Sequence, residues 1–565
     1  MTTDKEKKPL LSIKNLDVQY RGYEQYYALK SISFSLKENE VLGIIGESGS
    51  GKSTLAMTIM ALLDQRISGK IEFKGVDLLT ANRGTLQKLR WDKIAIVFQN
   101  SLEVLNPVLQ VGEQVLETII EHRNISREAA KNAVYDLFSM VKLNRKWYRA
   151  YPHELSGGMR QKVLIAMAIS LNPELLIVDE PTMALDAIAK NDITELLKKL
   201  QKQHRFSMIV ISHELPIIKE LSSHLVVLYA GTIVEKGITA DIIKNPRHPY
   251  TRGLLESSPA MNPYKDMWGI PGESGMCTGD KCPFYERCTQ RLDICNNQMP
   301  SLKVIEDGRS ISCHRGGIIT MLNAFNITKK YGSIFACKNC SLQIFSGEVI
   351  SIIGQTGSGK STLAEALSGI IQPNSGSVSF ENRLVVRNSE TAKMNGMQII
   401  FQDPLSSINE QKSILKIIRE PLDILKWKSK IERNDKVIKM LKNVQLQSDD
   451  VFLNKKGFML SGGQKQRISI ARALITEPKL LIADEISAML DASTGANILR
   501  LIKGLQNKIG FSMILITHDL SLAQKVSDKI YVMKEGEIIE HGSTLEVFTN
   551  PKHEYTKQLL SFLGL

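Results

Sequence analysis

The stretch "GESGSGKST" occupies residues 46–54, and a close copy, "GQTGSGKST", occupies residues 354–362. The first copy follows the apolar run "EVLGIIG", which is typical of a buried parallel strand, and precedes "STLAMTIMALL", which is typical of a helix. Glycines at such a junction let the backbone curl, so that N–H groups and the helix N-terminus face phosphate oxygens. The sequence therefore predicts one nucleotide phosphate site in each half of the chain.

Each loop carries residue types that suit a nucleotide and its magnesium ion. We expect Lys52 and Lys360 to reach the β and γ phosphates, and the hydroxyls of Ser53 and Ser361 to ligate magnesium. The other loop residues predicted to bind the nucleotide are Gly46, Ser48, Gly49, Ser50, Gly51 and Thr54 in the first copy, and Gly354, Thr356, Gly357, Ser358, Gly359 and Thr362 in the second.

Four further motifs accompany the loop, in the same order, in both halves. The first half carries "FQN" with Gln99, "LSGGMRQ" from Leu155, "LLIVDE" ending at Glu180 and "ISHE" with His213. The second half carries "FQD" with Gln402, "LSGGQKQR" from Leu460, "LLIADE" ending at Glu485 and "ITHD" with His518. An ordered set repeated in this way indicates two duplicated domains.

The apolar run before each Asp-Glu pair predicts a second buried strand. That strand would deliver Asp179 and Asp484 to magnesium. It would also bring Glu180 and Glu485 beside the γ phosphate, where a carboxylate can orient and deprotonate water. A single Asp-Glu pair after a strand is usually only a polar strand end, so this prediction depends on the whole ordered set.

Two more polar residues recur at matching places. His213 and His518 follow strand-like runs and are predicted to contact the γ phosphate, thereby linking its presence to domain geometry. Gln99 and Gln402 are predicted to ligate magnesium or to hold the attacking water. The alternatives are a structural hydrogen-bonding histidine and an ordinary loop glutamine.

The bulk properties are those of a multidomain globular protein. A chain of 565 residues is expected to form two to four domains. No apolar run approaches the roughly 18 residues of a membrane-spanning helix, and the start "MTTDKEKKP" lacks the apolar segment of a signal peptide, so we expect a cytosolic chain. The net charge of +13 is scattered along the chain and indicates mainly a solvated surface.

The repeat divides the chain into a first nucleotide-binding domain over residues 1–260, a linker over residues 261–320 and a second nucleotide-binding domain over residues 321–565. The linker is rich in Pro, Gly and Cys and shows no clear helical or strand periodicity. Each domain ends with a predicted pair of short strands, "VVLYAGTIVEKG" and "YVMKEGEIIEHG", and a matching tail, "NPRHPYT" and "NPKHEYT".

The linker cysteines form a possible metal-binding set. Candidate ligands are Cys282, Cys288, Cys295 and Cys313, with Cys277 and His314 as spare candidates. Four thiolates can hold an iron-sulfur cluster or zinc, although the paired C-x2-C knuckles usual for zinc are absent. Reduced thiols without metal are the third alternative. The remaining cysteines, Cys337 and Cys340, are predicted to be core residues.

The position of "LSGG" ahead of "LLIVDE" makes both halves resemble the ATP-binding cassette (ABC) ATPases. The resemblance implies an α/β fold with two P-loop NTPase domains in tandem, joined by the small Cys-containing linker. It also implies ATP and Mg²⁺ as ligands.

In that family the signature loop of one cassette closes over ATP held by the other, so one cassette cannot form a complete site. Carried over to this chain, one site consists of Lys52, Gln99, Asp179, Glu180 and His213, facing Ser461, Gly462 and Gly463. The other consists of Lys360, Gln402, Asp484, Glu485 and His518, facing Ser156, Gly157 and Gly158. Tyr331 matches the aromatic residue that stacks on adenine, and Tyr20 and Tyr23 compete for this role in the first half.

A narrower resemblance is to the ATPase subunits of oligopeptide, dipeptide and nickel importers. The stretches "YPHELSGGMRQKVLIAMAI", "HPYT", "IPGE" and "CPFYERC" are similar to the first ATPase of those systems, and the second half is similar to its partner. The resemblance implies a fused motor at the cytoplasmic face of the cell membrane, with two integral membrane permease subunits, an extracytoplasmic solute-binding protein and no nucleic acid. Some members carry a 4Fe-4S cluster on a similar Cys pattern.

A soluble tandem-cassette ATPase that acts on ribosomes or nucleic acid is the alternative. Such proteins join their cassettes through a long, highly charged helical linker, whereas this linker carries Cys and Pro. The sequence therefore favours transport.

Overall fold

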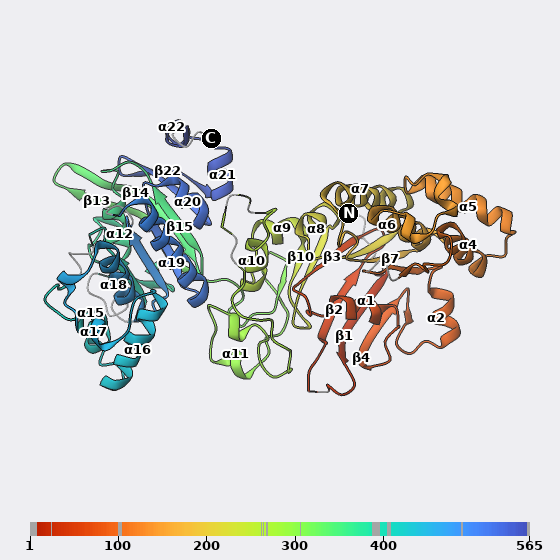
Figure 1. Cartoon of the computed structure of the whole chain (residues 1–565), viewed down its shortest axis with the longest axis horizontal. Coiled ribbons are helices and arrows are strands. Elements are labelled where there is room, and N and C mark those ends of the chain that lie inside the picture. Colours follow the sequence, from red (N-terminus) through yellow and green to blue (C-terminus); the bar gives the residue numbers. More distant parts are fainter. Residues whose placement is uncertain are drawn as a thin grey trace, which may run out of the picture. The chain divides into compact units, whose positions relative to one another are not determined.

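The computed structural model describes residues 8–23, 25–99, 104–261, 263, 265–266, 269–305, 307–386, 396–403, 408–486 and 490–561. The chain divides into two compact units, and we describe each by itself (Figure 1). The first unit contains the described residues up to 261, with 272–287 and 291–317. The second contains those within 262–271, 288–290 and 318–561. Each unit holds one phosphate loop.

The first unit is built on a large mixed sheet. Its strands are β3 (Val41–Ile45), β6 (Ile94–Val97), β7 (Leu175–Asp179), β8 (Ser207–Ile211), β9 (His224–Tyr229), β10 (Thr232–Ile238), β11 (Lys303–Val304) and β12 (Ser310–Ile311). Their order is β11-β12-β10-β9-β3-β8-β7-β6, and the pairs from β9 to β6 are parallel. Parallel strands end at the same edge of a sheet, so the residues that follow β3, β7 and β8 meet there.

A smaller antiparallel sheet covers the apolar side chains beside the phosphate loop. It contains β1 (Leu11–Gln19), β2 (Leu29–Leu36), β4 (Arg66–Phe73) and β5 (Val76–Asp77), in the order β2-β1-β4-β5. Leu16, Leu29 and Ile71 of this sheet share one buried cluster with Ile44 and Ile177 of the large sheet. Burial of such side chains, at about 1.5–3 kcal/mol each, holds the two sheets together.

The helices of the first unit complete its layers. They are α1 (Lys52–Ile59), α2 (Arg83–Leu89), α4 (Val111–His122), α5 (Arg127–Met140), α6 (Gly157–Ile169), α7 (Ala187–His204), α8 (Leu215–Leu221), α9 (Thr239–Lys244), α10 (Pro249–Glu256) and α11 (Ile294–Asn297), with the 3-10 turns η1 (Arg145–Arg149), η2 (Pro152–Glu154) and η3 (Tyr285–Arg287). Helices α4, α5 and α6 pack on one another as a helical group beside the sheet (Figure 1).

The second unit repeats this architecture. Its main sheet contains β15 (Val349–Ile353), β18 (Met397–Ile400), β19 (Leu480–Asp484), β20 (Ser512–Ile516), β21 (Lys529–Lys534) and β22 (Glu537–Ser543), in the order β18-β19-β20-β15-β21-β22. Its smaller sheet contains β13 (Thr320–Tyr331), β14 (Ile334–Phe345), β16 (Ser375–Phe380) and β17 (Arg383–Leu384), in the order β14-β13-β16-β17. The repeated strand order confirms the predicted duplication.

The helices of the second unit match most of those in the first. They are α12 (Lys360–Leu367), α15 (Ile414–Ile424), α16 (Lys430–Asn443), α17 (Asp450–Asn454), α18 (Gly462–Leu474), α19 (Ala492–Ile509), α20 (Leu520–Val526), α21 (Thr544–Thr549) and α22 (Glu554–Ser561), with the 3-10 turn η4 (Gly457–Met459). In neither unit does any helix among the described residues have both the length and the apolar character needed to cross a membrane.

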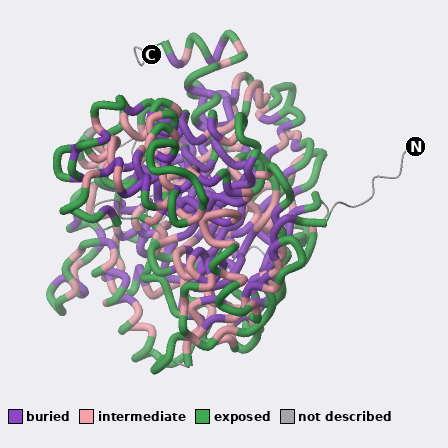
Figure 2. The backbone as a smooth tube through the Cα atoms, turned by 90° about the vertical axis from the view of Figure 1, so that its right-hand side faces the viewer, coloured by how far each residue is buried: buried purple, intermediate pink, exposed green. Residues whose placement is uncertain are grey.

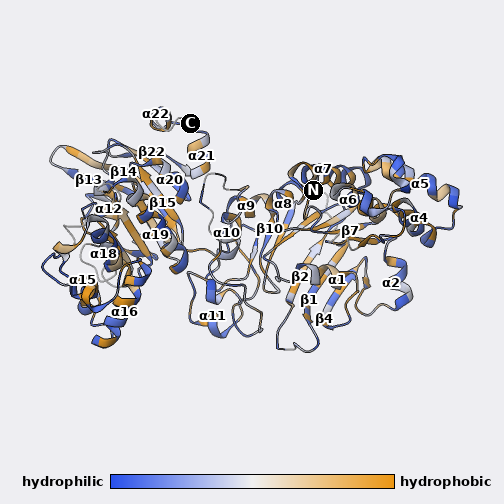
Figure 3. Ribbon diagram, viewed as in Figure 1, coloured by the Kyte–Doolittle hydropathy of each residue, from blue (hydrophilic) through white to orange (hydrophobic). Residues whose placement is uncertain are grey.

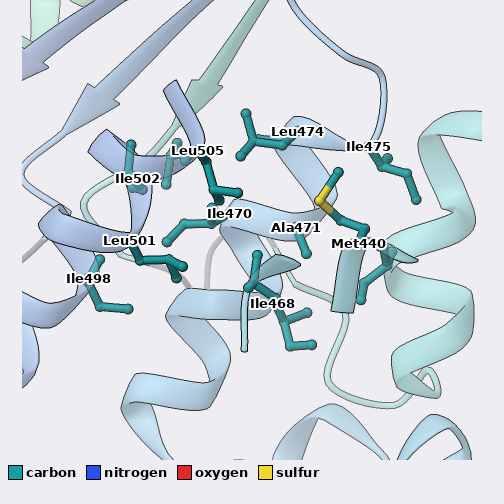
Figure 4. Close-up of a cluster of buried hydrophobic side chains, with 14 of the residues drawn as sticks. Met440, Ile468, Ile470, Ala471, Leu474, Ile475, Ile498, Leu501, Ile502 and Leu505 are labelled. Atoms are coloured by element: carbon teal, nitrogen blue, oxygen red, sulfur yellow. The ribbon is translucent and has the colours of Figure 1, made fainter. Parts of the chain in front are cut away.

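Buried hydrophobic side chains explain why these elements pack together. Figure 4 shows one cluster in which Ile468, Ile470 and Leu474 of α18 lie against Ile498 and Ile502 of α19. Hydrophobic residues gather on the central strands (Figure 3), and the buried backbone runs through the interior while exposed segments surround it (Figure 2). Continuous apolar runs such as "LLIVD" are therefore buried strands, as the sequence predicts.

Much of the predicted linker has structure of its own. Strand β12 pairs with β10, so residues near 310 extend the sheet of the first unit. The backbone N–H of Tyr27 donates to the carbonyl of Cys277 at 2.9 Å. The predicted strand pairs that precede the tails are confirmed as the β9–β10 and β21–β22 hairpins.

Candidate functional site

The phosphate loop of the first unit leaves β3 and turns into α1 at Gly51. Gly51 has a left-handed backbone, with φ of 97°, and a Cβ there would lie 2.6 Å from the Ala28 carbonyl oxygen. Both the conformation and the close approach require glycine. No side chain caps the first turn of α1. The N–H groups at this helix start can therefore meet an anion.

The lysine of each loop is held by the loop itself. Lys52 Nζ donates to the carbonyls of Gly46 at 2.8 Å and Glu47 at 2.9 Å. Lys360 Nζ donates to the carbonyls of Gly354 and Gln355, each at 2.9 Å. Burial lowers the pKa of both lysines, against the attraction of the neighbouring carboxylates. A phosphate in the loop would offset the cost of burying this positive charge.

The Ser and Asp residues predicted to bind magnesium meet in both units. The Ser53 hydroxyl hydrogen-bonds to the Asp179 carboxylate, and Ser361 does the same with Asp484. Burial raises the pKa of both aspartates. Their Oδ1 atoms are buried and have no hydrogen-bond partner among the described atoms. An orphaned buried carboxylate oxygen beside a hydroxyl is suited to a hard cation that prefers oxygen ligands, so these residues fit Mg²⁺.

The carboxylate predicted to act as a base follows directly in the first unit. Glu180 is buried, and its backbone is left-handed, with φ of 49°. Its Oε2 lies 2.8 Å from Nδ1 of His213, and its Oε1 accepts a hydrogen bond from the His213 backbone N–H at 3.1 Å. The structure thus brings the predicted base and the predicted switch histidine together.

The same residues converge in the second unit with different spacing. Glu485 also has a left-handed backbone, with φ of 43°. Its Oε2 accepts a hydrogen bond from Gln402 Nε2 at 3.0 Å and lies 3.6 Å from Nδ1 of His518. Its Oε1 lies 3.9 Å from Nζ of Lys360. Three predicted site residues therefore surround the Glu485 carboxylate.

The glutamines differ between the units. Gln99 Nε2 lies 3.1 Å from the Met183 sulfur, in the loop after Glu180. Gln402 instead donates to Glu485. The structure therefore brings Gln402, and not Gln99, onto the carboxylate of its unit.

The signature residues open two helices. Ser156 caps α6 by accepting a hydrogen bond from the Met159 N–H at 3.3 Å, and Ser461 caps α18 by accepting one from the Gln464 N–H at 3.4 Å. Gly157 and Gly158 form the first turn of α6, and Gly462 and Gly463 form that of α18. A Cβ on Gly158 would lie 3.3 Å from Cβ of Ala189, so α6 and α7 approach closely there.

The candidate adenine-stacking residues lie at the ends of the small sheets. The Tyr20 hydroxyl is 3.0 Å from Oγ1 of Thr54, the last residue of the first phosphate loop. Tyr23 is more exposed, at 65% against 36% for Tyr20. Tyr331 is the last residue of β13 and is half exposed. Of the two candidates in the first unit, Tyr20 therefore contacts the phosphate loop.

Sequence reasoning missed a tyrosine that supports each phosphate loop. The Tyr250 hydroxyl accepts a hydrogen bond from the Glu47 N–H at 2.8 Å, and the Tyr555 hydroxyl accepts one from the Gln355 N–H at 3.1 Å. Both tyrosines belong to the repeated tails "HPYT" and "HEYT". The repetition of these tails was the signal that could have found them.

A buried ion pair also supports the first loop. The Arg287 guanidinium donates to Oε2 and Oε1 of Glu47 at 2.6 and 3.0 Å, and its side chain is only 4% exposed. The ring of Tyr229 packs near this guanidinium. The segment around Arg287 therefore holds the second residue of the loop.

The described linker cysteines give the predicted metal site no support. Cys277, Cys295 and Cys313 lie near Cys282. Burial raises the pKa of the Cys282 thiol to about 11. In the part of the chain that the structure describes, no group of three or more His, Cys, Asp or Glu side chains could hold a metal ion. The spare candidate His314 lies 2.9 Å, through Nε2, from the Gln298 carbonyl.

Comparison with known proteins identifies the family. Residues 29–183 and 337–488 match the family described as "ABC transporter", and residues 234–295 match the "Oligopeptide/dipeptide transporter, C-terminal region".

Three relatives are similar over nearly the whole chain. The oligopeptide transport ATP-binding protein OppD of Mycobacterium tuberculosis is 33% identical, over 98% of both chains. The uncharacterized ABC transporter ATP-binding protein YejF of Escherichia coli is 35% identical, over 98% of this chain and 99% of that one. The glutathione import ATP-binding protein GsiA of Escherichia coli is 34% identical, over 98% of this chain and 89% of that one. With one phosphate loop and one Asp-Glu pair in each unit, the chain is an ATP-hydrolysing member of the ABC transporter ATPase family that carries two cassettes in tandem.

Proposed function

We propose that this chain is the ATP-hydrolysing motor of a membrane importer for peptides, or for a related solute such as a nickel or metal-chelate complex. The observation that carries the proposal is the match of residues 234–295 to the oligopeptide/dipeptide transporter C-terminal region. Two residues of that region, Tyr250 and Arg287, contact the first phosphate loop. The region that marks the transporter class is thus joined to an ATP site.

Each signature loop completes the ATP site of the other unit in this proposal. Ser461 and Gly463 face the site that contains Lys52, and Ser156 and Gly158 face the site that contains Lys360. The exposed helix starts at Ser156 and Ser461 support this role, because hydroxyl and backbone N–H groups at a helix start bind phosphate oxygens. ATP bound at both sites would clamp the units together, and hydrolysis would release them.

Within the first site each residue has a distinct task. The loop N–H groups and Lys52 bind the β and γ phosphates, and Tyr20 stacks on adenine. Ser53 and Asp179 would hold Mg²⁺, which supplies neutralisation of phosphate charge. Glu180 accepts a proton from the attacking water, and His213 orients its carboxylate. In the second site Lys360, Ser361, Asp484, Glu485 and His518 take the corresponding tasks, with Tyr331 on adenine.

The proposed partners are two integral membrane permease subunits that dock near Gln99 and Gln402, and an extracytoplasmic solute-binding protein. The chain would then be peripheral, on the cytoplasmic face of the membrane. The names of two relatives, which print oligopeptide transport for OppD and glutathione import for GsiA, support this placement. The alternative role on ribosomes or nucleic acid finds no support among these relatives.

Purification of the tagged chain from its own cells separates the two functions. We expect integral membrane proteins to copurify with it in mild detergent, and added peptide with binding protein to raise ATP turnover. Cosedimentation with ribosomes, without any membrane partner, would overturn the proposal.

The paired change Glu180→Gln with Glu485→Gln tests the chemistry. We expect ATP binding to persist while turnover falls by on the order of 10²-fold or more, because positioning survives and water activation is lost. ATP binding and phosphate release are measured on the same preparation. Undiminished turnover would show that neither glutamate is the base.

The 4Fe-4S cluster implied by the family resemblance stays a prediction, and the described cysteines give it no support. Anaerobically purified protein tests it through iron content and broad visible absorption. The cluster predicts stoichiometric iron and that absorption. Absence of both signals would overturn the prediction.

A further inference from the structure

Two cysteines outside the linker form a bonded pair in β14. Cys337 and Cys340 are buried, and their thiols hydrogen-bond to each other. Residues three apart in a straight strand point to opposite faces. Here the pairing with β13 shifts register between Ile327 and Lys329, and Asn339 has a left-handed φ of 51°. This bulge turns both thiols toward the same interior.

The pair lies beside the second phosphate loop. Cys337 Sγ is 3.7 Å from the carbonyl oxygen of Gly359, the loop residue before Lys360. Cys340 Sγ is 3.1 Å from the carbonyl oxygen of Gly536, in the turn between β21 and β22. The N–H of Gly536 in turn donates to the Ser358 carbonyl at 3.0 Å. The two thiols therefore link this loop to the turn that supports it.

Packing alone does not require cysteine at these positions. The first unit has the same bulge in β2, where Ser31 has a φ of 51°. Leu29 and Ile32 occupy the equivalent buried positions there. The Ala28 carbonyl approaches Gly51 in the first unit as the Ala336 carbonyl approaches Gly359 in the second. Hydrocarbon side chains thus fill the same space, and only the second unit carries a dithiol there.

We propose that Cys337 and Cys340 are an oxidation site, at which hydrogen peroxide forms a disulfide that weakens ATP binding to the second phosphate loop. The effect on ATP binding rests on the proposed function of that loop. Formation of the disulfide is independent of that function.

The reaction takes two balanced steps. The Cys340 sulfur attacks one peroxide oxygen, so that an S–O bond forms, the O–O bond breaks and water leaves. The Cys337 sulfur then attacks the Cys340 sulfur, so that the S–S bond forms and a second water leaves with the Cys337 proton. Two thiols are oxidised, and one peroxide is reduced to two waters. The hydrogen bond from Cys337 lowers the pKa of Cys340 against the effect of burial, which favours Cys340 as the attacking sulfur.

The two buried cysteines flank exposed residues of an edge strand. β14 is an edge strand of its sheet, and Lys338 and Asn339 between the cysteines are exposed. Disulfides in a reducing compartment are usually transient and redox-sensing, so a reversible bond is expected.

Oxidation would change the contacts of the loop. A disulfide holds its two sulfur atoms about 2 Å apart, closer than hydrogen-bonded thiols lie. It also removes both S–H donors, so the carbonyls of Gly359 and Gly536 lose these contacts. Because Gly359 precedes Lys360, we expect the loop to bind phosphate less tightly.

The first experiment tests the bond itself. The full-length chain is treated with hydrogen peroxide, denatured, alkylated and digested. We expect the peptide that contains residues 337 and 340 to escape alkylation, to be lighter by two hydrogen atoms and to regain both thiols with dithiothreitol. The control is Cys337→Leu with Cys340→Ile, which copies the first unit. Two alkylated thiols after peroxide, or oxygen-bearing sulfurs without a cross-link, would overturn the proposal.

The second experiment tests the effect on ATP. Photolabelling with azido-ATP, mapped by digestion, reports each phosphate loop separately in one chain. We expect peroxide to reduce labelling of the second unit about threefold or more at subsaturating ATP, to leave the first unit unchanged and to spare the control variant. Unchanged labelling of the oxidised second unit would overturn the coupling. Absence of labelling there in the reduced protein would instead overturn the proposed function of that loop.

Discussion

Glu180 and Glu485 carry the clearest sign of function at the scale of single residues. Both adopt a left-handed backbone, which costs an ordinary residue about 1–3 kcal/mol and recurs at functional sites. In each unit this conformation directs a carboxylate toward the switch histidine. The sequence motifs single out these two residues, and the left-handed backbone, which other residues of the chain also adopt, helps to place their carboxylates.

Arg287 allows a residue-scale prediction, because its ion pair supports one phosphate loop and not the other. Arg287→Ala would leave the carboxylate of Glu47 unpaired beside the phosphates. We expect ATP affinity of the first unit to fall about tenfold while the second unit is unchanged. Azido-ATP labelling of each unit measures the two affinities.

Two further variants control this prediction. Arg291 is a nearby arginine that donates an exposed hydrogen bond to the Glu286 carbonyl. Arg291→Ala should therefore leave the ATP affinity of the first unit unchanged. Glu47→Gln copies Gln355 of the second unit, so adding it to Arg287→Ala should restore part of the affinity. Equal ATP affinity in Arg287→Ala and the unmodified chain would show that the pair is only structural.

At the scale of elements, α10 ties the tail of the first unit to its phosphate loop. Its N-cap, His248, is buried and accepts a hydrogen bond from the Tyr250 N–H at 3.1 Å. Burial lowers the pKa of His248 from 6.5 to about 3. Below about pH 6.5 the unfolded chain therefore binds a proton that the folded unit does not, so stability falls as pH falls.

This pH dependence gives the element-scale prediction. When the pH falls from about 7 to about 5, the unfolding free energy of the first unit should fall by about 2 kcal/mol in the unmodified chain. The His248→Gln variant should not show this loss. Hydrogen exchange of β9 at the two pH values measures the difference. His553→Gln changes the half-buried counterpart in the second unit and serves as the control. The same acid loss in His248→Gln would mean that another group titrates.

The sequence predicted those elements and loops whose patterns lie within a few consecutive residues. The phosphate loops, the strands of "LLIVDE" and the two terminal hairpins are encoded in runs of a few residues. The contacts of Tyr250 and Arg287 with Glu47 span 203 and 240 residues, and no local pattern reports such distances. Gln99 and Gln402 contact different residues, and this difference depends on which neighbour each side chain reaches. The cysteine spacing allowed a metal site, and the described cysteines give it no support.

At the scale of the whole molecule, the two units carry matching site residues but arrange them differently. The Asp, Glu and His residues are present in both units. The His213–Glu180 distance is 2.8 Å and the His518–Glu485 distance is 3.6 Å. Gln402 contacts its glutamate, whereas Gln99 contacts Met183. We therefore expect different hydrolysis rates at the two sites.

The last prediction is that neither site is restricted to binding. In a single-turnover experiment on preloaded ATP, Glu180→Gln and Glu485→Gln made separately should each reduce the amount or initial rate of ATP cleaved, because each removes the base of one site. Steady-state turnover cannot make this distinction, since coupling between sites lets one change slow both. Glu214→Gln is the matched control, because the Glu214 carboxylate lies in the same unit but hydrogen-bonds to Lys190 and Thr182. If either site variant cleaves preloaded ATP with the amount and rate of the unmodified chain, that site only binds ATP, and the chain works with a single hydrolytic site.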